Sequence, residues 1–368
     1  MKLSIITINY NDANGLKKTL ESVAAQTYAH IQHIIVDGAS TDGSAEVLEA
    51  YPQPLPEGKG EEPTPGPSLK GGEIDASLKT CAEGNKDDYP HQNPAHKVIW
   101  VSEKDSGIYN AMNKGIEIAL GKRVVNEDHT SEALPIDIQH STFNIQQKSD
   151  YIQILNSGDI LAAPDVSERM MAALVQASPK SSPEGKDFYK PGDRLTPPFR
   201  EGQGVGLFYG NMTKVNAAGQ VVGKSGYTEY SLRQFYQSTL NHDCAYIRKD
   251  LFEEYGLYDE NLKIVSDWKW YLQAIGLGRV KPMYVDIDVT IFDDGGISET
   301  QLDRRAAERR QVLEELLPPA VLWDYDTHAF EMEQMKRLRR WKLYPVVYFM
   351  ERVLFKLEKW GVLRMRRG

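Results

Sequence analysis

Cysteine is scarce in this 368-residue chain: Cys81 and Cys244 are the only two, and neither belongs to a CxxC or zinc-type spacing. This argues against a disulfide-stabilised scaffold and predicts two reduced thiols in a cytosolic protein. No stretch reaches the roughly 18 to 20 apolar residues of a membrane span. The apolar run at the N-terminus is short and is interrupted by Thr7 and Asn9, so we expect no signal peptide.

Two common nucleotide-binding motifs are also missing. No GxGxxG follows the first apolar run, which disfavours a nicotinamide-type dinucleotide fold, and no GxxxxGK[ST] of a P-loop occurs anywhere. The net charge of −9 argues against nucleic acid as a general partner. The charge is uneven, however, because from Lys336 onward Glu351 and Glu358 are the only acids among many Arg and Lys residues. An acidic body with a basic tail indicates an anionic surface as partner of the tail.

The first part of the chain alternates short β-branched runs with helical patterns. Apolar runs that predict buried strands alternate with amphipathic segments that predict helices. The expected strands are residues 3–8, 31–36, 98–101 and 151–155, and the expected helices are residues 16–25, a segment capped by Thr41 or Asp42, and residues 106–120. This βαβ alternation predicts an α/β fold with a mainly parallel sheet.

The second part has a different character. From Gly206 onward the pattern predicts short antiparallel strands, three helices and a last strand over residues 283–292. Helices are expected over 299–317 and 341–358. Three segments rich in Pro, Gly and polar residues interrupt the pattern, and we interpret them as surface insertions: residues 52–94, 121–150 and 178–203. We therefore expect one α/β domain over residues 1–300, with halves 1–160 and 205–300, followed by a helical region over 301–368.

Polar residues collect where the predicted parallel strands end. Asp37 follows the second strand, where an acid either accepts from a ribose hydroxyl or a base imide, or caps the Asp-Gly turn. Lys104, Asp105 and Gly107 follow the third strand, either as nucleotide contacts or as the start of a capped helix. Asp159 follows the fourth strand, either as a metal ligand beside a diphosphate or as a solvated turn residue. Carboxyl ends of parallel strands share one edge of the sheet, so a single site is predicted there.

Two further residues point to acid–base chemistry. Asp267 begins a helix in residues 264–272 (IVSDWKWYL), where the helix dipole favours a carboxylate and keeps it ionised, as a general base requires. The same dipole accounts for a purely structural acid at this position. His242 stands alone in residues 240–248 (LNHDCAYIR). A lone histidine is more often structural, but the nearness of the Asp267 segment favours contact with a ligand.

Taken in order, these segments resemble a family 2 glycosyltransferase of the GT-A fold. Residues 103–115 (EKDSGIYNAMNKG) are the most specific match and look like the subgroup that builds colanic-acid-type surface polysaccharides. The opening strand and helix, the second strand with its acidic turn, and the strand end at the position of the family's DxD motif are also similar: residues 4–11 (SIITINYN) and 20–26 (LESVAAQ), 34–43 (IIVDGASTDG), and 155–159 (LNSGD). The resemblance covers most of residues 1–300 outside the insertions.

The resemblance implies inverting transfer of a sugar from a nucleotide-diphosphate sugar, UDP- or GDP-linked, to a polysaccharide or lipid-linked glycan acceptor. It implies Asp267 as general base, with His242 near the acceptor or donor sugar. Asp159, with Asn156, would hold Mg²⁺ or Mn²⁺. The nucleotide would be held by Thr7, Asn9, Asp37, Lys104, Asp105, Gly107 and Asn113.

The sequence departs from the family at several positions. Asn156 and Gly158 stand where acids are usual in DxD, which leaves one carboxylate, and Asp243 replaces the Gln of a His-Gln pair. A catalytically degenerate GT-A subunit that only binds nucleotide sugar or assists assembly is therefore an alternative. A nucleotidyltransferase is a second alternative, but residues 9–15 lack the basic GxGTR-like loop that such enzymes carry.

The C-terminal segment has an aromatic and apolar face bordered by basic residues, over 341–368. This pattern predicts either an interfacial helix on the anionic inner face of the cell membrane or a helix packed on protein. The first interpretation gives a cytoplasmic enzyme that associates peripherally with the membrane and meets a lipid-linked acceptor there.

Overall fold

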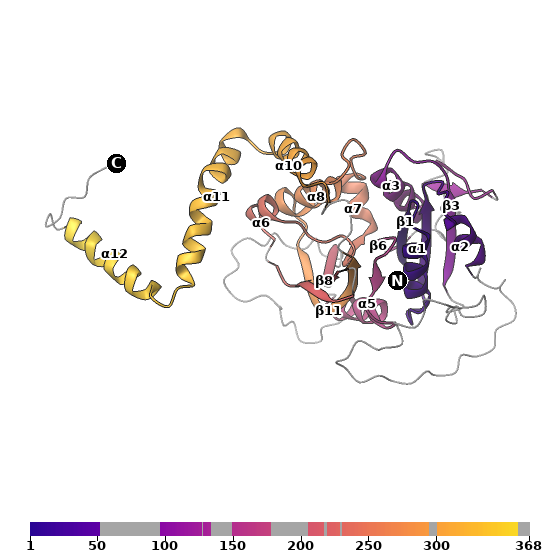
Figure 1. Cartoon of the computed structure of the whole chain (residues 1–368), viewed down its shortest axis with the longest axis horizontal. Helices are drawn as coiled ribbons and strands as arrows, with labels where there is room; N and C mark the ends of the chain where they lie inside the picture. The colour runs from indigo at the N-terminus through magenta and orange to yellow at the C-terminus, as the bar shows by residue number, and fades with distance from the viewer. Residues whose placement is uncertain are drawn as a thin grey trace. The chain divides into compact units, whose positions relative to one another are not determined.

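The computed structural model describes residues 1–51, 96–126, 128–133, 149–177, 205–216, 219–228, 230–293 and 300–359. The chain divides into two compact units, Met1–Glu308 and Arg309–Gly368. The elements, in order (Figure 1), are β1 (Leu3–Asn9), α1 (Ala13–Ala24), β2 (Ile31–Asp37), α2 (Ser44–Ala50), β3 (Lys97–Ser102), α3 (Ile108–Ala119), β4 (Arg123–Val125), β5 (Ser131–Ala133), β6 (Tyr151–Asn156), β7 (Ile160–Leu161), α5 (Val166–Ala177), β8 (Leu207–Val215), β9 (Val221–Ser225), α6 (Leu232–Gln237), β10 (Ala245–Arg248), α7 (Lys249–Tyr255), α8 (Ser266–Tyr271), η3 (Leu272–Leu277), β11 (Pro282–Asp293), α10 (Leu302–Leu316), α11 (Pro319–Arg339) and α12 (Tyr344–Lys359).

One large sheet organises the first unit, in the order β3-β2-β1-β6-β10-β8-β11-β7, with β9 paired to β8. Strands β3, β2, β1 and β6 run parallel, so Ser102, Asp37, Asn9 and Asn156 reach the same edge of the sheet. Beyond β6 the sheet contains antiparallel pairs, β6–β10, β10–β8, β8–β9 and β11–β7, together with one parallel pair, β8–β11. The predicted α/β class, with a mainly parallel sheet and a smaller antiparallel portion, is confirmed.

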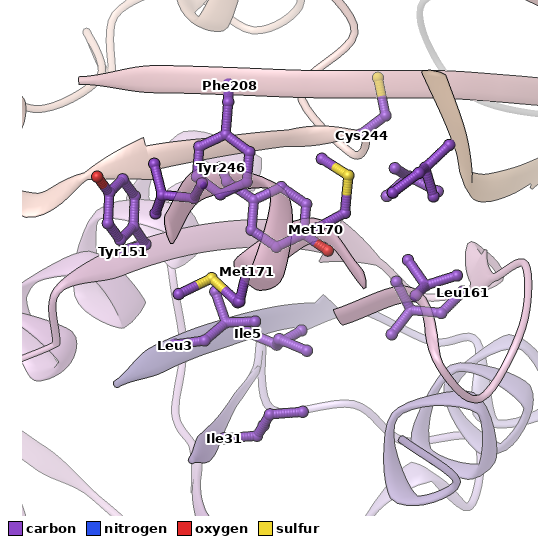
Figure 2. Packing of buried hydrophobic residues seen from close by; sticks show 14 of the residues in the cluster. Leu3, Ile5, Ile31, Tyr151, Leu161, Met170, Met171, Phe208, Cys244 and Tyr246 are labelled. Atoms are coloured by element: carbon purple, nitrogen blue, oxygen red, sulfur yellow. The ribbon is translucent and has the colours of Figure 1, made fainter. Parts of the chain in front are cut away.

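Helices cover both faces of this sheet. One buried cluster lies between the sheet and α5 and includes Leu3, Tyr151, Phe208, Met170 and Tyr246 (Figure 2). A second cluster joins α1 and α2 to β2 and β3. The opposite face of β1 and β2 receives α3, which approaches closely at Gly115, where an added Cβ would collide with Ile6. Because β1 and β2 are buried along their whole length, they carry few polar residues before their carboxyl ends.

Some elements differ from the predictions. The segment 121–150 was interpreted as a surface insertion, yet its described residues include the β4–β5 hairpin, and His129 in the turn stacks on Trp100 at 3.5 Å between ring centroids. Helices α5 and α11 were missed. The apolar residues of α11 do not gather on one face, so α11 lacks the apolar repeat that predicts most helices. The predicted insertions at 52–94 and 178–203 lie outside the described residues.

The second unit contains α11 and α12, and α12 is coloured yellow in Figure 1. No residue of α12 is buried, and its large apolar side chains are exposed. Within the described ranges, no helix is long and apolar enough to cross a membrane.

Candidate active site

The carboxyl ends of β1, β2, β3 and β6 meet in a network of hydrogen bonds. Asn9 donates through Nδ2 to Asp37 Oδ1 at 2.7 Å, and its Oδ1 accepts from Ser157 Oγ at 2.8 Å. Asp37 also accepts from Ser102 Oγ at 2.7 Å and from the backbone N–H of Ser40 at 3.0 Å. Asp37 is fully buried, so its carboxylate holds the strand ends together and presents no exposed surface to a ligand.

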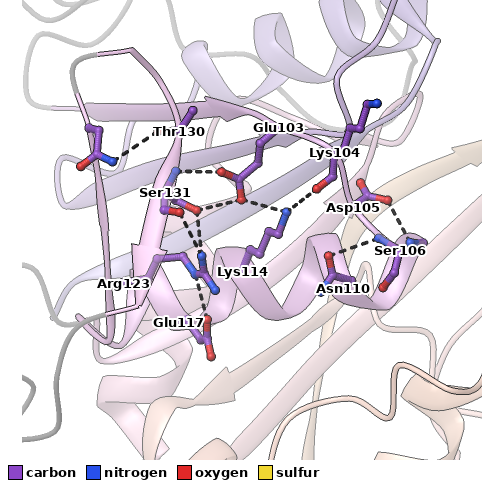
Figure 3. A network of polar contacts seen from close by, with 12 residues as sticks. Glu103, Lys104, Asp105, Ser106, Asn110, Lys114, Glu117, Arg123, Thr130 and Ser131 are labelled. Atoms are coloured by element: carbon purple, nitrogen blue, oxygen red, sulfur yellow. Dashed lines mark hydrogen bonds and ion pairs between the residues drawn. The ribbon is translucent and has the colours of Figure 1, made fainter.

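Charged groups connect the loop after β3 to α3 and to the β4–β5 hairpin (Figure 3). Lys114 Nζ forms an ion pair with Glu103 at 2.8 Å and donates to the backbone oxygen of Lys104 at 2.9 Å. Glu103 also accepts from the backbone N–H of Ser131 in the hairpin. The exposed side chain of Lys104 points away from this ion pair. The loop is therefore held rigidly while Lys104 stays available to a ligand.

Two glycines bring this loop close to its neighbours. A Cβ on Gly38 would lie 2.7 Å from Asp105 Oδ2, so the absence of a side chain at Gly38 leaves room for Asp105 over the end of β2. Asp105 Oδ1 accepts from the backbone N–H of Gly107 at 2.9 Å, and Gly107 has a φ of +136°. This conformation favours glycine. Asp105 thus lies beside the end of β2. The roles of Asp105 and Gly107 in nucleotide binding stay predictions.

Two other predicted nucleotide contacts are placed differently. Thr7 is fully buried, and its hydroxyl is hydrogen-bonded to His33 Nε2 at 2.9 Å inside the sheet. Asn113 donates to the backbone oxygen of Tyr258 and to Glu260 and accepts from the backbone N–H of Tyr258. These bonds use the donors and the oxygen of the Asn113 side chain to join α3 to the segment before α8. The structure gives both residues interior, structural contacts, and their predicted role in nucleotide binding stays a prediction.

Asp267 lies between two partners from different elements. Its Oδ1 accepts from the hydroxyl of Tyr109 on α3 at 2.8 Å, and its Oδ2 lies 3.4 Å from His242 Nδ1. Burial alone would raise the pKa of Asp267, but the contacts with His242 and Tyr109 outweigh it and hold the pKa below its ordinary value. The Asp267 side chain remains 15% exposed. It is therefore ionised at neutral pH and has some surface open to a substrate.

His242 connects Asp267 with the end of β6. Burial opposes its charged form, but the hydrogen bond with Asp267 and the charges of Asp267, Asp243 and Asp159 raise the pKa of His242 to about 9. Its Nε2 lies 3.1 Å from Asn156 Nδ2. A doubly protonated His242 ring donates a hydrogen bond from each nitrogen. The amide oxygen of Asn156 accepts the bond from Nε2 once the oxygen and nitrogen of that amide are exchanged, an exchange that leaves the shape of the side chain unchanged.

Asp159 is buried in the turn after β6. Burial, reinforced by the charge of Asp243, raises the pKa of Asp159 well above its ordinary value. Among the described residues, Asp159 Oδ2 has no hydrogen-bond partner. A buried carboxylate oxygen without a partner is costly unless a proton or a cation meets it.

This carboxylate oxygen fits a hard divalent cation in a limited way. The described residues contain no group of three His, Cys, Asp or Glu side chains arranged to hold a metal. Mg²⁺ is commonly bound by one or two carboxylates together with substrate phosphates and water. Asp159 fits that pattern as the protein's carboxylate ligand, and the other oxygens would come from a bound diphosphate.

The structure thus brings Asn156, Asp159, His242 and Asp267 together, and it adds two residues that the sequence reasoning missed. Tyr109 lies in the middle of the predicted nucleotide-binding segment, where nothing marked it as a partner of Asp267. Asp243 was noted only as a replacement, yet it accepts from Thr290 Oγ1 at 2.7 Å and acts electrostatically on Asp159. The position of Asp243 directly after His242 is the sequence feature that could have identified it as part of the site.

The family model and two curated proteins that resemble this chain are all described as glycosyltransferases. The family model described as Glycosyl transferase family 2 matches residues 4–60. An uncharacterized glycosyltransferase of Mycobacterium tuberculosis is 25% identical over 298 residues, which cover 80% of this chain and 76% of the relative. A PGL/p-HBAD biosynthesis glycosyltransferase of the same organism is 19% identical, over 83% of this chain and 82% of the relative.

Two solved structures are similar at a lower level. The S. aureus TarS crystal structure matches with a TM-score of 0.45 and 15% identity over 87% of this chain, which corresponds to only 41% of the length of TarS. The mannosyltransferase PcManGT from Pyrobaculum calidifontis, solved with GDP-Man and Mn²⁺, matches with a TM-score of 0.44 and 14% identity over 96% of this chain and 85% of its own.

Proposed function

Since this chain belongs to the family 2 glycosyltransferases, we propose that it is an inverting enzyme that transfers a sugar from a UDP- or GDP-linked donor to a hydroxyl group of a glycan acceptor. The resemblance stated from the sequence is confirmed for the family, whereas the surface-polysaccharide subgroup stays a prediction. The observation that carries the proposal is the ionised, partly exposed Asp267 held between Tyr109 and His242.

In the proposed reaction, Asp267 takes the proton of the acceptor hydroxyl. The hydroxyl oxygen forms a bond to the anomeric carbon while the bond to the diphosphate oxygen breaks on the opposite face, which inverts the anomeric configuration and releases a nucleoside diphosphate. Tyr109 and His242 keep Asp267 ionised and fix its orientation, so no reorganisation is needed when the acceptor arrives. The imidazolium of His242 also balances the negative charge of Asp159 and Asp243.

The donor side of the site is proposed to be the edge at the end of β2, where Lys104 and Asp105 contact the donor and buried Asp37 holds the strand ends in place. The exposed ammonium of Lys104 offers a positive charge for a phosphate, and Asp105 lies over the end of β2. A divalent cation held by Asp159 would neutralise the leaving diphosphate when bound. The phosphates of the donor would therefore lie between the positively charged Lys104 loop and a cation held by the carboxylate of Asp159.

A donor panel tests this function. We expect slow hydrolysis of one nucleotide sugar, in the presence of Mn²⁺ or Mg²⁺, from a panel of UDP-, GDP- and dTDP-linked sugars, measured as nucleoside diphosphate release. Product nuclear magnetic resonance (NMR) with an acceptor would show an inverted anomeric configuration. Nucleotide binding with no turnover of any donor, even with candidate acceptors, would instead support the degenerate binding subunit.

The exposed face of α12 supports a second proposal, peripheral association with an anionic membrane. Val346, Met350 and Leu354 share one face of α12 at i, i+4 spacing and are 57%, 54% and 41% exposed, and Lys356 and Lys359 lie in the last turn. An amphipathic helix with basic flanks binds the headgroup region through its apolar face and its charges. Each basic residue near such a surface contributes on the order of 1 kcal/mol.

Vesicle co-sedimentation tests the membrane proposal. We expect the full-length chain to sediment with vesicles of phosphatidylcholine and phosphatidylglycerol, and binding to fall at least about tenfold when Met350 and Leu354 are both replaced by serine, because about 3 kcal/mol or more of apolar burial is lost. Binding should weaken in high salt. Equal sedimentation of wild type and variant, or none by either, would exclude the proposal. Donor hydrolysis should be the same for both.

A further inference from the structure

A group of tyrosines lies at the antiparallel end of the sheet. Tyr209 on β8 contacts Tyr284 on β11 and Tyr230, with ring centroids 5.5 and 5.4 Å apart. Tyr227, in the segment after β9, meets Tyr284 edge to face at 5.6 Å. We call these four residues the tyrosine platform. Its innermost ring, Tyr209, is buried, whereas Tyr227 is 69% exposed, so the platform rises from the core to the surface.

The exposed end of the platform is held in place without a ligand. The hydroxyl of Tyr209 donates to the backbone oxygen of Thr228 at 3.0 Å and accepts from the backbone N–H of Thr228 at 3.2 Å. These two bonds fix the backbone next to Tyr227. A large aromatic side chain kept exposed on a fixed backbone loses little conformational entropy on binding, which is a common property of recognition surfaces.

Polar groups border the same rings. The hydroxyl proton of Tyr284 is shared between Asn211 Oδ1 at 2.7 Å and Asp286 Oδ1 at 2.9 Å. Asn211 Nδ2 donates to Asp286 and Asp288, each at 3.0 Å. Lys224 pairs with Asp288 at 2.6 Å. Hydrogen bonds from Asn211 and Tyr284 hold the pKa of Asp286 below its ordinary value, so this exposed carboxylate is ionised at neutral pH. The carboxylates offer acceptors for hydroxyl groups, and Lys224 offers a donor.

The platform continues into the candidate active site. Ser225, at the end of β9, accepts a hydrogen bond from Asn241 Nδ2 at 3.0 Å, and Asn241 directly precedes His242. Thr290, farther along β11 than Tyr284, donates to Asp243 at 2.7 Å. One chain of contacts therefore connects Tyr227 with His242, and a second connects β11 with Asp243.

We propose that the tyrosine platform is a binding subsite for pyranose rings of the acceptor glycan. The apolar C–H face of a pyranose stacks on Tyr227 and Tyr284, while its hydroxyls donate to Asp286 and Asp288 and accept from Lys224. A purely apolar partner would leave this ionised border without ligand contacts, and a polyanionic partner would be repelled by its two carboxylates. The inference deepens the proposed function, because it assigns the place where an extended acceptor is held beyond the reacting hydroxyl.

Saturation-transfer NMR on the full chain tests the subsite. The probes are the methyl pyranosides of glucose, galactose, mannose and N-acetylglucosamine. We expect at least one to receive saturation from the wild-type protein, strongest on its ring C–H protons, and its affinity to fall about tenfold in Tyr227→Ala, because one stacking face is lost. Asp286→Ala should also weaken binding. Val222→Ala, exposed on the same hairpin, is the matched control and should bind as wild type.

Donor hydrolysis, measured on the same preparations, separates the two proposals. Unchanged pyranoside signals in Tyr227→Ala, or no signal from the wild type with any of the four probes, overturn the subsite even if donor hydrolysis is normal. Absence of donor hydrolysis in the wild type, together with pyranoside binding that depends on Tyr227, overturns the transferase proposal and leaves the subsite standing. Thermal unfolding of each variant confirms that the exposed substitutions leave the fold intact.

Discussion

Asp267→Asn will lower the rate of sugar transfer about 10³-fold while leaving the affinity for the nucleoside diphosphate unchanged. General base catalysis typically contributes a factor of 10² to 10⁴, and Asn cannot accept the proton. Asn keeps the size of the side chain and can still accept from Tyr109, so the local structure should survive. Initial rates with the donor identified by the panel and calorimetric binding of UDP or GDP measure the two quantities.

Tyr109→Phe is the informative control, because it removes a hydrogen bond to Asp267 and keeps the aromatic ring. Asp267 has a lowered pKa partly because Tyr109 donates to it, so losing this bond raises that pKa. Activity requires ionised Asp267 and is lost as pH falls through its pKa. The acidic limb of the rate profile should therefore move to higher pH in Tyr109→Phe, with a smaller loss of rate at neutral pH than in Asp267→Asn.

Two results would contradict this assignment. Transfer that persists at a substantial rate in Asp267→Asn would show that another group takes the proton. An acidic limb in Tyr109→Phe that coincides with the wild-type limb would show that the carboxylate controlling the rate is not the one bonded to Tyr109.

Asp159→Asn will reduce donor turnover about 10²-fold or more and remove the stimulation by Mn²⁺. The amide is a weaker cation ligand than a carboxylate, and the charge it would help to neutralise belongs to the leaving diphosphate. A readout independent of turnover is the gain in Tm when UDP or GDP and Mn²⁺ are added together, which should be large in wild type and small in the variant. Asp165→Asn, on the half-exposed turn before α5, is the control.

The same substitution should stabilise the protein without ligands. Asp159 has a folded-state pKa raised by burial and by Asp243, so the folded state is destabilised as pH rises through that value. Asn cannot ionise, and the free energy of unfolding at pH 7 should therefore increase. A site that gains stability when its function is removed is a common trade-off. Full activity of Asp159→Asn in EDTA would show that no metal is needed, and a lower Tm in the absence of ligands would contradict the electrostatic argument.

Much of the nucleotide half follows from local sequence patterns. Strands such as β1 and β2 are rich in β-branched residues because both of their faces are buried, and Asp37 and Asp159 mark strand ends that must share one edge of a parallel sheet. Helix α11 shows the opposite case, since its apolar residues follow no helical repeat. Asn113 shows a third case. It lies in a recognisable motif, but the motif could not reveal that the amide of Asn113 joins α3 to Tyr258.

The sequence by itself determined the fold class, the family and the carboxylates at the strand ends, because periodicity and short motifs depend on neighbouring residues. Only the tertiary structure decided how distant groups meet. It placed Tyr109 on Asp267 across 158 positions and His242 between Asp267 and Asn156, and it joined Tyr209, Tyr227 and Tyr284 in one platform. Such contacts arise from the packing of helices against one face of the sheet and from pairing between strands far apart in the chain, which no local pattern encodes.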